Sequence, residues 1–193
     1  MQAAQKKPLI AQKFSLIGLL AFGPLVACEP TAVEPPATPP ASVDTGCGVN
    51  GALQTALFGS LQTAVNWSGS EMMCESMQRP DGDGIRLRFA GPVAEQQLAI
   101  IIAIPGMRRG QNAVELPSNV TTTVDGSGRF FSTPNLDSCW TDIDSQAAVS
   151  GEKDSDSISG TLYCVAPLGE VNGDAAVSIP ELSFTTIVEW KEK

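Results

Sequence analysis

Four cysteines between residues 47 and 164 constrain the fold of this chain more than any other feature of its sequence. They are Cys47, Cys74, Cys139 and Cys164. An even number of cysteines in an oxidising compartment predicts two disulfides, and four cysteines allow three pairings. We favour Cys47–Cys74 together with Cys139–Cys164. The alternative is that each cysteine bridges the two sheets of a sandwich.

A strand register supports the second pair. We place Cys139 opposite Cys164 in two antiparallel strands. One face then carries the cysteines with the apolar residues Ile143, Ile158 and Leu162. The other face carries Trp140, Tyr163, Asp142 and Asp144. Farther along, the same register pairs Asp144 with Ser159 and Ser145 with Ile158, unless Gly160 marks a bulge that shifts it. The turn falls at residues 150–154.

Alternation of apolar and polar residues recurs along residues 46–193 and predicts further strands. These strands are residues 85–89, 120–124, 129–133, 175–179 and 182–190. Residues 98–104 form a continuous apolar run, which predicts a strand buried on both faces. Many short strands with frequent turns predict an all-β fold. We expect a disulfide-stapled antiparallel β-sandwich, with an Ig-like or a barrel-like arrangement as the alternatives.

Residues 52–67 have two interpretations. Four apolar residues recur every four positions, as on one face of a helix: Leu53, Leu57, Leu61 and Val65. The same residues also alternate with small or polar ones, as in strands. Gly59 weakens a helix interior but can mark a bend in a sheet. Thr, Val and Trp67 favour strands, with the helix as the alternative.

The first 27 residues have the pattern of a signal peptide rather than of a folded element. Three lysines precede residues 14–27, which carry no charge. This run is too short for a membrane-spanning helix, which needs about 20 residues. It leads into the tetrapeptide Leu25-Val26-Ala27-Cys28.

The tetrapeptide resembles the lipobox of bacterial lipoproteins. The resemblance implies that residues 1–27 are removed, that the Cys28 thiol receives a diacylglycerol and that the new amine is acylated. Several acyl chains on one residue form a durable membrane anchor. Glu29 implies the outer membrane, by resemblance to enterobacterial sorting. The alternative is an ordinary signal peptide in which Cys28 has no role.

Residues 28–45 are predicted to be a stalk. Five prolines fall within residues 29–45, and no hydrophobic period is present. Such a segment cannot bury enough surface to fold and favours an extended chain. We therefore expect a signal peptide over residues 1–27, a lipidated cysteine with a disordered stalk over residues 28–45, and a β-sandwich domain over residues 46–193.

Four phrases within the predicted domain resemble exported proteobacterial proteins of unknown activity. They are GIRLRFAGP (84–92), GRFFST (128–133), CWTDID (139–144) and LYCVAPLGEVNG (162–173). This resemblance implies no particular activity.

Composition excludes several classes of function. The chain has no histidine, and therefore no Ser-His-Asp triad, no Cys-His dyad and no histidine-ligated metal. A formal net charge of −9 disfavours binding to nucleic acid. The Asp-rich turns at residues 81–83 and 154–156 do not match a calcium-binding loop. We therefore predict no catalytic residue, no metal and no cofactor.

We expect a non-enzymatic binding or structural module that a lipid holds at the membrane and that contacts an envelope protein. The candidate recognition face consists of Trp140, Tyr163, Asp142 and Asp144, because exposed aromatic residues often anchor interfaces. The first alternative is an inhibitor or sequestering protein for a cationic target such as a lysozyme-like enzyme, which an acidic surface would steer. The second is a hydrolase that uses paired carboxylates.

Overall fold

Alternating apolar and polar residues become antiparallel strands in the computed structural model, which describes residues 45–191. The strands divide into two layers. The first layer has the order β2 (Thr63–Ser68), β1 (Ala52–Gly59), β14 (Glu181–Glu189), β11 (Ser155–Cys164), β10 (Cys139–Ala148) and β7 (Leu116–Pro117). The second layer has the order β13 (Ala176–Ser178), β12 (Leu168–Glu170), β9 (Arg129–Ser132), β8 (Asn119–Val124), β6 (Gln96–Ile104) and β5 (Ile85–Val93). Two short strands, β3 (Met73–Cys74) and β4 (Met77–Gln78), pair with β5, and two 3-10 turns are η1 (Gly69–Glu71) and η2 (Leu136–Ser138).

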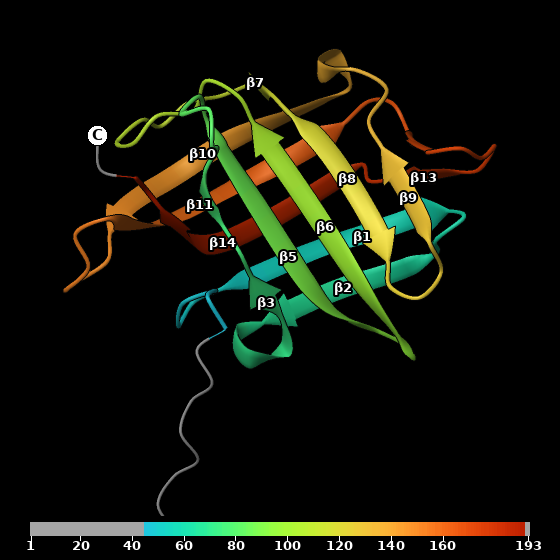
Figure 1. Ribbon diagram of the computed structural model, residues 1–193, viewed down its shortest axis with the longest axis horizontal. Helices are drawn as coiled ribbons and strands as arrows, with labels where there is room; N and C mark the ends of the chain where they lie inside the picture. Colours follow the sequence, from blue (N-terminus) through green and yellow to red (C-terminus); the bar gives the residue numbers. More distant parts are fainter. Residues whose placement is uncertain (1–44, 192–193) are drawn as a thin grey trace, which may run out of the picture. The chain divides into compact units, whose positions relative to one another are not determined.

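Hydrogen-bonded strands join the two layers at two places, so that the 14 strands of residues 45–191 form one sheet folded over itself. β1 leaves β14 and pairs with β13 at Phe58 and Gly59. β14 pairs with β4, in parallel, at Glu189. In Figure 1, β5 and β6 cross in front of β11, β14 and β1. The predicted all-β, antiparallel, disulfide-stapled fold is confirmed, and the two joins close it in a barrel-like way.

The core lies between the layers and takes alternate residues from each strand. β5 contributes Ile85, Leu87 and Phe89, which are all fully buried. The ring of Phe184, on β14 of the other layer, has its centroid 5.9 Å from that of Phe89. Burial of each such side chain contributes about 2 kcal/mol to stability.

The burial of β6 shows that one prediction is wrong, namely that residues 98–104 form a strand buried on both faces. The run over residues 98–104 is buried on both faces only at Leu98, Ala99 and Ile100, whereas Ile101 and Ala103 are half-buried. Continuous burial is typical of parallel sheets that are covered on both sides. β6 lies in an antiparallel layer, and the outer side of that layer stays partly open to solvent.

Residues 52–67 contain β1 and most of β2, as predicted, and not a helix. β1 and β2 form a hairpin, and one face of it packs into the core with the buried side chains of Leu53, Leu57, Val65 and Trp67. Gly59 lies where β1 passes from β14 to β13, with a φ of 94°. A Cβ atom at this position would come within 2.6 Å of the Ala176 carbonyl oxygen. The join between the layers therefore requires glycine here.

Both predicted disulfides form, Cys47–Cys74 and Cys139–Cys164. Cys139 and Cys164 are opposite residues of β10 and β11, so this bridge lies within one layer. The alternative of a bridge between two sheets is wrong for this pair. Two disulfides indicate that the protein folds in an oxidising compartment.

The predicted register is correct from Cys139 as far as Ile143, and beyond it the register shifts, as the alternative of a bulge at Gly160 predicts. The cause is a bulge in β10 that leaves Asp144 without a partner in β11. The structure pairs Ser145 with Ser159 and Gln146 with Ile158, in place of the predicted pairs Asp144–Ser159 and Ser145–Ile158.

Gly160 lies at the edge of this bulge. The Phe184 ring covers it, since a Cβ atom on Gly160 would lie 2.9 Å from the ring. The extra residue in β10 places Gln146, and not Ser145, opposite the buried Ile158. From there the Gln146 Nε2 donates to the Asp156 carboxylate at 2.6 Å.

The predicted signal peptide, the lipidation site Cys28 and nearly all of the predicted stalk lie outside the described residues. Within residues 45–191, no helix has the length and apolar character that crossing a membrane requires.

We expect the Cys139–Cys164 disulfide to contribute about 3 kcal/mol to the free energy of unfolding, because it links residues 25 positions apart. The Cys139→Ser variant should lower the urea midpoint accordingly and leave one free thiol, on Cys164. Alkylation followed by peptide mass mapping locates the thiol. As a matched control, Cys74→Ser should free Cys47 alone. A thiol on Cys47 or Cys74 in the Cys139→Ser protein would contradict the pairing.

Candidate functional site

Two aromatic rings lie on the outer face of the first layer. Trp140 of β10 and Tyr163 of β11 are cross-strand partners, with ring centroids 6.0 Å apart and 25° between the ring planes. Both side chains are half-buried. Their neighbours on the adjacent strands are Pro117, opposite Trp140, and Glu181, opposite Tyr163. The register turns this pair away from the face that carries the disulfide.

Carboxylates surround the aromatic pair. The backbone N–H of Glu115 donates to Asp142 Oδ1 at 2.6 Å, which ties the loop before β7 to β10. Burial raises the pKa of the Tyr163 hydroxyl, and the negative charges of Asp142 and Glu115 raise it further. Tyr163 therefore stays protonated at neutral pH and presents a hydrogen-bond donor beside the carboxylates.

Of the four residues predicted for recognition, the structure brings Trp140, Tyr163 and Asp142 together. Asp144 is exposed in the bulge and has no partner in β11. Glu115 and Glu181 join the face, although no sequence motif marks either of them. They come from a loop and a strand far from β10 along the chain, and only the packing of the sheet places them here.

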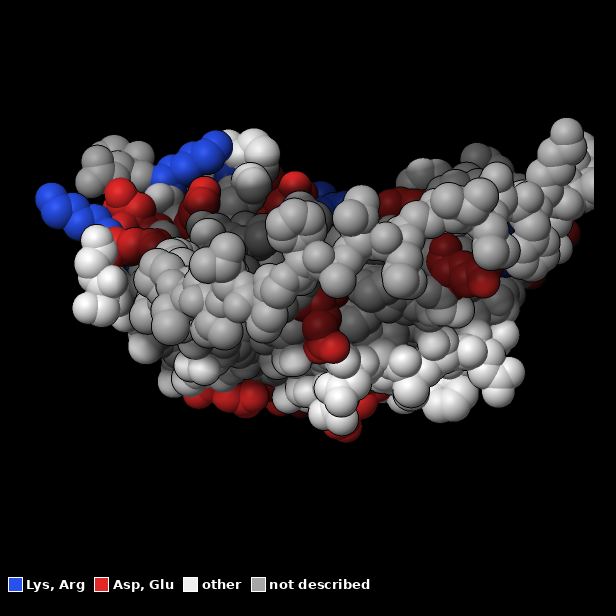
Figure 2. Space-filling view, turned by 90° about the horizontal axis from the view of Figure 1, so that it is seen from below, with Lys and Arg blue, Asp and Glu red and all other residues white. Residues whose placement is uncertain are grey.

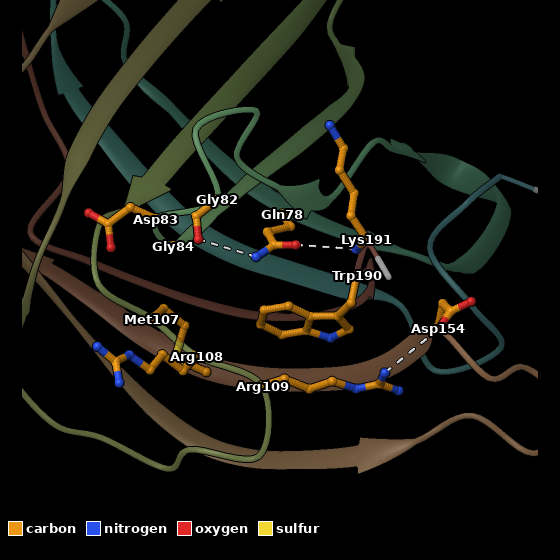
Figure 3. A pocket seen from close by; sticks show the side chains of 10 residues that line it. All are labelled: Gln78, Gly82, Asp83, Gly84, Met107, Arg108, Arg109, Asp154, Trp190 and Lys191. Atoms are coloured by element: carbon orange, nitrogen blue, oxygen red, sulfur yellow. Dashed lines mark hydrogen bonds and ion pairs between the residues drawn. The ribbon is translucent and has the colours of Figure 1, made fainter. Parts of the chain in front are cut away.

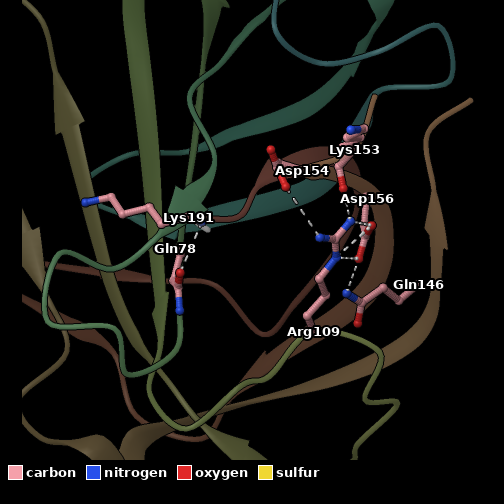
Figure 4. A network of polar contacts seen from close by, with 7 residues as sticks. All are labelled: Gln78, Arg109, Gln146, Lys153, Asp154, Asp156 and Lys191. Carbon is pink, nitrogen blue, oxygen red and sulfur yellow. Dashed lines mark hydrogen bonds and ion pairs between the residues drawn. The ribbon is translucent and has the colours of Figure 1, made fainter. Parts of the chain in front are cut away.

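A buried carboxylate, Asp156 of β11, organises a second polar region (Figure 4). Its side chain is 6 % exposed. Arg109, from the loop after β6, donates to both carboxylate oxygens through Nε and Nη2 at distances of 2.8 to 3.2 Å. The same Nη2 donates to the Lys153 carbonyl at 2.8 Å. This arrangement ties the β6–β7 loop to the beginning of β11.

Asp156 stays charged despite its burial. Burial raises the pKa of this carboxyl, but hydrogen bonds from Arg109 and Gln146 and the charge of Arg109 outweigh that effect, and the pKa lies below its ordinary value. The Trp190 indole N–H also lowers this pKa, although it makes no full hydrogen bond within residues 45–191. The carboxylate therefore holds the loop by a charge-assisted contact.

Beside this network the surface is hollowed (Figure 3). The hollow has a volume of about 700 Å³, and its wall comes from Gln78, residues 82–84, residues 107–109, Asp154 and residues 190–191. Gln78 links two of these segments, because its Nε2 donates to the Gly82 carbonyl and its Oε1 accepts from the Lys191 backbone N–H, both at 3.2 Å.

Two carboxylates line the hollow, Asp83 and Asp154, and they lie on opposite sides of it (Figure 3). Asp154 pairs with Arg109, with its Oδ1 3.9 Å from Nη1. The two groups do not converge on one point as the acid and base of a hydrolase would. Within residues 45–191, no three cysteine, aspartate or glutamate side chains are grouped so as to hold a metal ion.

Comparison of the chain with protein-family models, with curated proteins and with solved structures gives no match. We therefore argue the function from the described residues and from the motifs of the sequence.

We expect Asp156→Asn to lower the free energy of unfolding by about 2 kcal/mol at pH 7, because Arg109 then loses the charge of its buried partner. The folded-state pKa of Asp156 is lowered, so the carboxylate stabilises the fold above its ordinary pKa of 3.8. That contribution disappears as the pH falls through the lower folded-state value. Urea unfolding of the wild type and the variant between pH 7 and pH 3 measures it.

The matched control is Asp154→Asn, which removes a carboxylate from a longer and more exposed contact with the same arginine. We expect this control to change the free energy of unfolding by less than about 0.5 kcal/mol. The assigned role of Asp156 would be contradicted if the two variants lost the same free energy of unfolding. It would also be contradicted if the difference in free energy of unfolding between Asp156→Asn and the wild type did not become smaller as the pH falls to 3.

Proposed function

We propose that this protein is an exported, lipid-anchored binding module of the bacterial cell envelope, without catalytic activity, and that it recognises a cationic protein. The observation that carries the proposal is the Trp140–Tyr163 pair on an outer strand face, with carboxylates around it. A sequestering or inhibitory role follows directly if the cationic partner is an enzyme.

The chemistry of this face suits the side chains of lysine and arginine. An aromatic ring attracts a cation through its electron-rich face, and a nearby carboxylate completes the contact with a charge-assisted hydrogen bond. Asp142, Glu115 and Glu181 supply the carboxylates. A net charge of −9 on the whole chain would steer a basic protein toward the domain.

The support for a lipid anchor comes from the sequence. Leu25-Val26-Ala27-Cys28 matches a lipobox, and Glu29 favours the outer membrane by resemblance. The oxidising compartment that the two disulfides indicate is compatible with export. A stalk over residues 29–45 could reach about 50 Å at the rise of an extended polyproline chain, so the domain could meet a partner away from the lipid surface.

We expect Cys28→Ser to release the protein from the membrane fraction and to leave the precursor uncut, because the acylated cysteine is both anchor and cleavage signal. Intact mass of the membrane-extracted wild type should show removal of residues 1–27 and added acyl chains. Cys47→Ser is the control, since it removes a cysteine outside the lipobox and should leave the acylation unchanged. Membrane association of the Cys28→Ser protein would contradict lipidation.

We expect Trp140→Ala to weaken binding to a purified basic lysozyme, used as a cationic probe, by about tenfold or more, because a central aromatic anchor is lost. Glu181→Gln should lower the association rate and its salt dependence. Surface plasmon resonance at low and high salt measures both.

The matched control is Phe130→Ala, since Phe130 is 50 % exposed on β9 of the other layer. It should bind the probe as the wild type does. Failure of the wild type to bind, binding that is indifferent to salt, or equal effects of Trp140→Ala and Phe130→Ala would each contradict recognition of a cationic protein through this face.

A further inference from the structure

A second hollow opens on the outer face of the first layer, where β1 leaves β14. β1 pairs with β14 as far as Thr55, opposite Leu182, and pairs with β13 from Phe58 onward. The strands part between these two pairings, and a hollow of about 420 Å³ lies there, which we call the fork hollow. Its lining consists of residues 54–56, Phe58, residues 64–66, residues 180–181 and Ser183.

Hydrogen bonds fix the shape of the fork hollow before any ligand binds. The Thr55 hydroxyl donates to the Glu181 carbonyl at 2.6 Å, at the point where the strands part. The Pro180 carbonyl accepts from the Cys164 backbone N–H at 3.2 Å, which ties the opposite wall to the end of β11. A ligand therefore does not have to order these segments, and this lowers the entropic cost of association.

Part of the lining is apolar and open to solvent. Phe58 is 48 % exposed. Ala64 and Pro180 are also exposed, and Ala56 is half-buried. Ala56 and Phe58 point outward from β1, because Leu57 between them is buried in the core. An apolar side chain that enters the hollow therefore removes apolar surface of both partners from water, which favours binding.

Two rows of side chains connect the fork hollow with the aromatic face. In the first row, Glu181 lines the hollow and is also the cross-strand partner of Tyr163, which in turn is the partner of Trp140. The second row crosses five strands through successive cross-strand pairs, and its members are Asp142, Thr161, Ser183, Gln54 and Asn66. The last three of these line the hollow. The aromatic face and the fork hollow are therefore parts of one continuous surface.

The charges along this surface favour a cationic ligand. Among the described residues that line the fork hollow, Glu181 is the one that carries a charge. Asp142, held by the Glu115 backbone N–H, adds a carboxylate beside the aromatic pair. In the view of Figure 2, most of the Lys and Arg side chains gather at one end, whereas acidic side chains are spread along the surface. A lysine or arginine side chain of a partner is thus attracted to the aromatic end of the surface.

The separation of the aromatic pair from the hollow matches the length of a short extended segment. Neighbouring strands lie about 4.8 Å apart, so the three steps from β10 through β11 and β14 to β1 separate Trp140 from the hollow by about 14 Å. Four residues of an extended chain span about 13 Å, and residues i and i+4 of such a chain point to the same side. One extended segment can therefore reach both places with two side chains.

We propose that the cationic partner binds through an extended segment that carries a basic residue and, four positions away, an apolar residue. The basic side chain lies against Trp140 and Tyr163 beside the carboxylates. The apolar side chain fills the fork hollow against Phe58. Between them, the backbone of the segment meets the hydroxyl and amide groups of Ser183 and Gln54. This inference rests on the proposed function, because the aromatic face is what recognises the basic residue.

NMR titration of the mature protein with short capped peptides tests the inference, and the indole N–H of Trp140 and the backbone amides report binding. The probe is acetyl-Lys-Thr-Ser-Thr-Leu-amide. The shifted peptide, acetyl-Lys-Thr-Ser-Leu-Thr-amide, has the same composition and charge. We expect the probe to bind about tenfold more tightly than the shifted peptide, because an extended chain turns the shifted leucine away from the hollow. A third peptide, with serine in place of the lysine of the probe, should bind about fivefold more weakly than the probe.

The outcomes separate this inference from the proposed function. Equal binding of the probe and the shifted peptide, with weaker binding of the serine peptide, would overturn the inference alone and leave recognition of a cation intact. Equal binding of the probe and the serine peptide would overturn both. The inference would also be overturned if no peptide bound at millimolar concentration, or if the neutral glycan chitotetraose bound this surface in place of the peptides.

Variants locate the apolar contact. Ala64→Phe places a ring at the exposed rim of the hollow and should abolish the preference for the probe over the shifted peptide, while the preference for lysine over serine remains. Phe58→Ala removes part of the apolar wall and should reduce the first preference at least threefold. Phe130→Ala is the matched control, since Phe130 is a similarly exposed phenylalanine of the other layer, and it should keep both preferences. Unchanged preferences in both hollow variants would overturn the assignment of the fork hollow.

Discussion

The rest of the structure depends on β14, because this strand forms hydrogen bonds along both of its edges. One edge pairs with β11 from Glu181 to Glu189. The other edge pairs first with β1 and then with β4, and so it joins the first layer to the second. These contacts connect residues as far apart as Ala52 and Thr185, and closing such long loops is entropically costly. The two disulfides offset part of that cost, since they constrain the unfolded chain.

The same strand connects the aromatic face around Trp140 with the charged hollow beside Asp156. At its beginning, Glu181 lies opposite Tyr163 and contributes a carboxylate to the aromatic face. Just past its end, Trp190 lines the charged hollow. The two regions therefore lie at opposite ends of one rigid element and differ in chemistry. The aromatic face is acidic and suits a cationic protein, whereas the lining of the hollow carries both signs of charge.

Local pattern predicted much of the fold, and its failures have identifiable causes. The pairing of Cys139 with Cys164 and the side of the strand that carries Trp140 follow from a period of two, which any antiparallel pair obeys. The register failed at Asp144 because β10 has a bulge there, next to Gly160, whose open face the Phe184 ring of β14 covers. That failure had a consequence for the polar network, since the bulge brings Gln146 to Asp156.

The sequence by itself determined the strand-rich character of the domain, the Cys139–Cys164 pair and the aromatic cross-strand pair, because each depends on the alternation of side chains along a strand. Only the tertiary structure decided that the two layers join through β1 and β14, that Glu115 and Glu181 stand beside Trp140, and that five separate segments enclose one hollow. These features depend on contacts between residues distant in the chain. No local period specifies such contacts, since they are set by how the layers pack against each other.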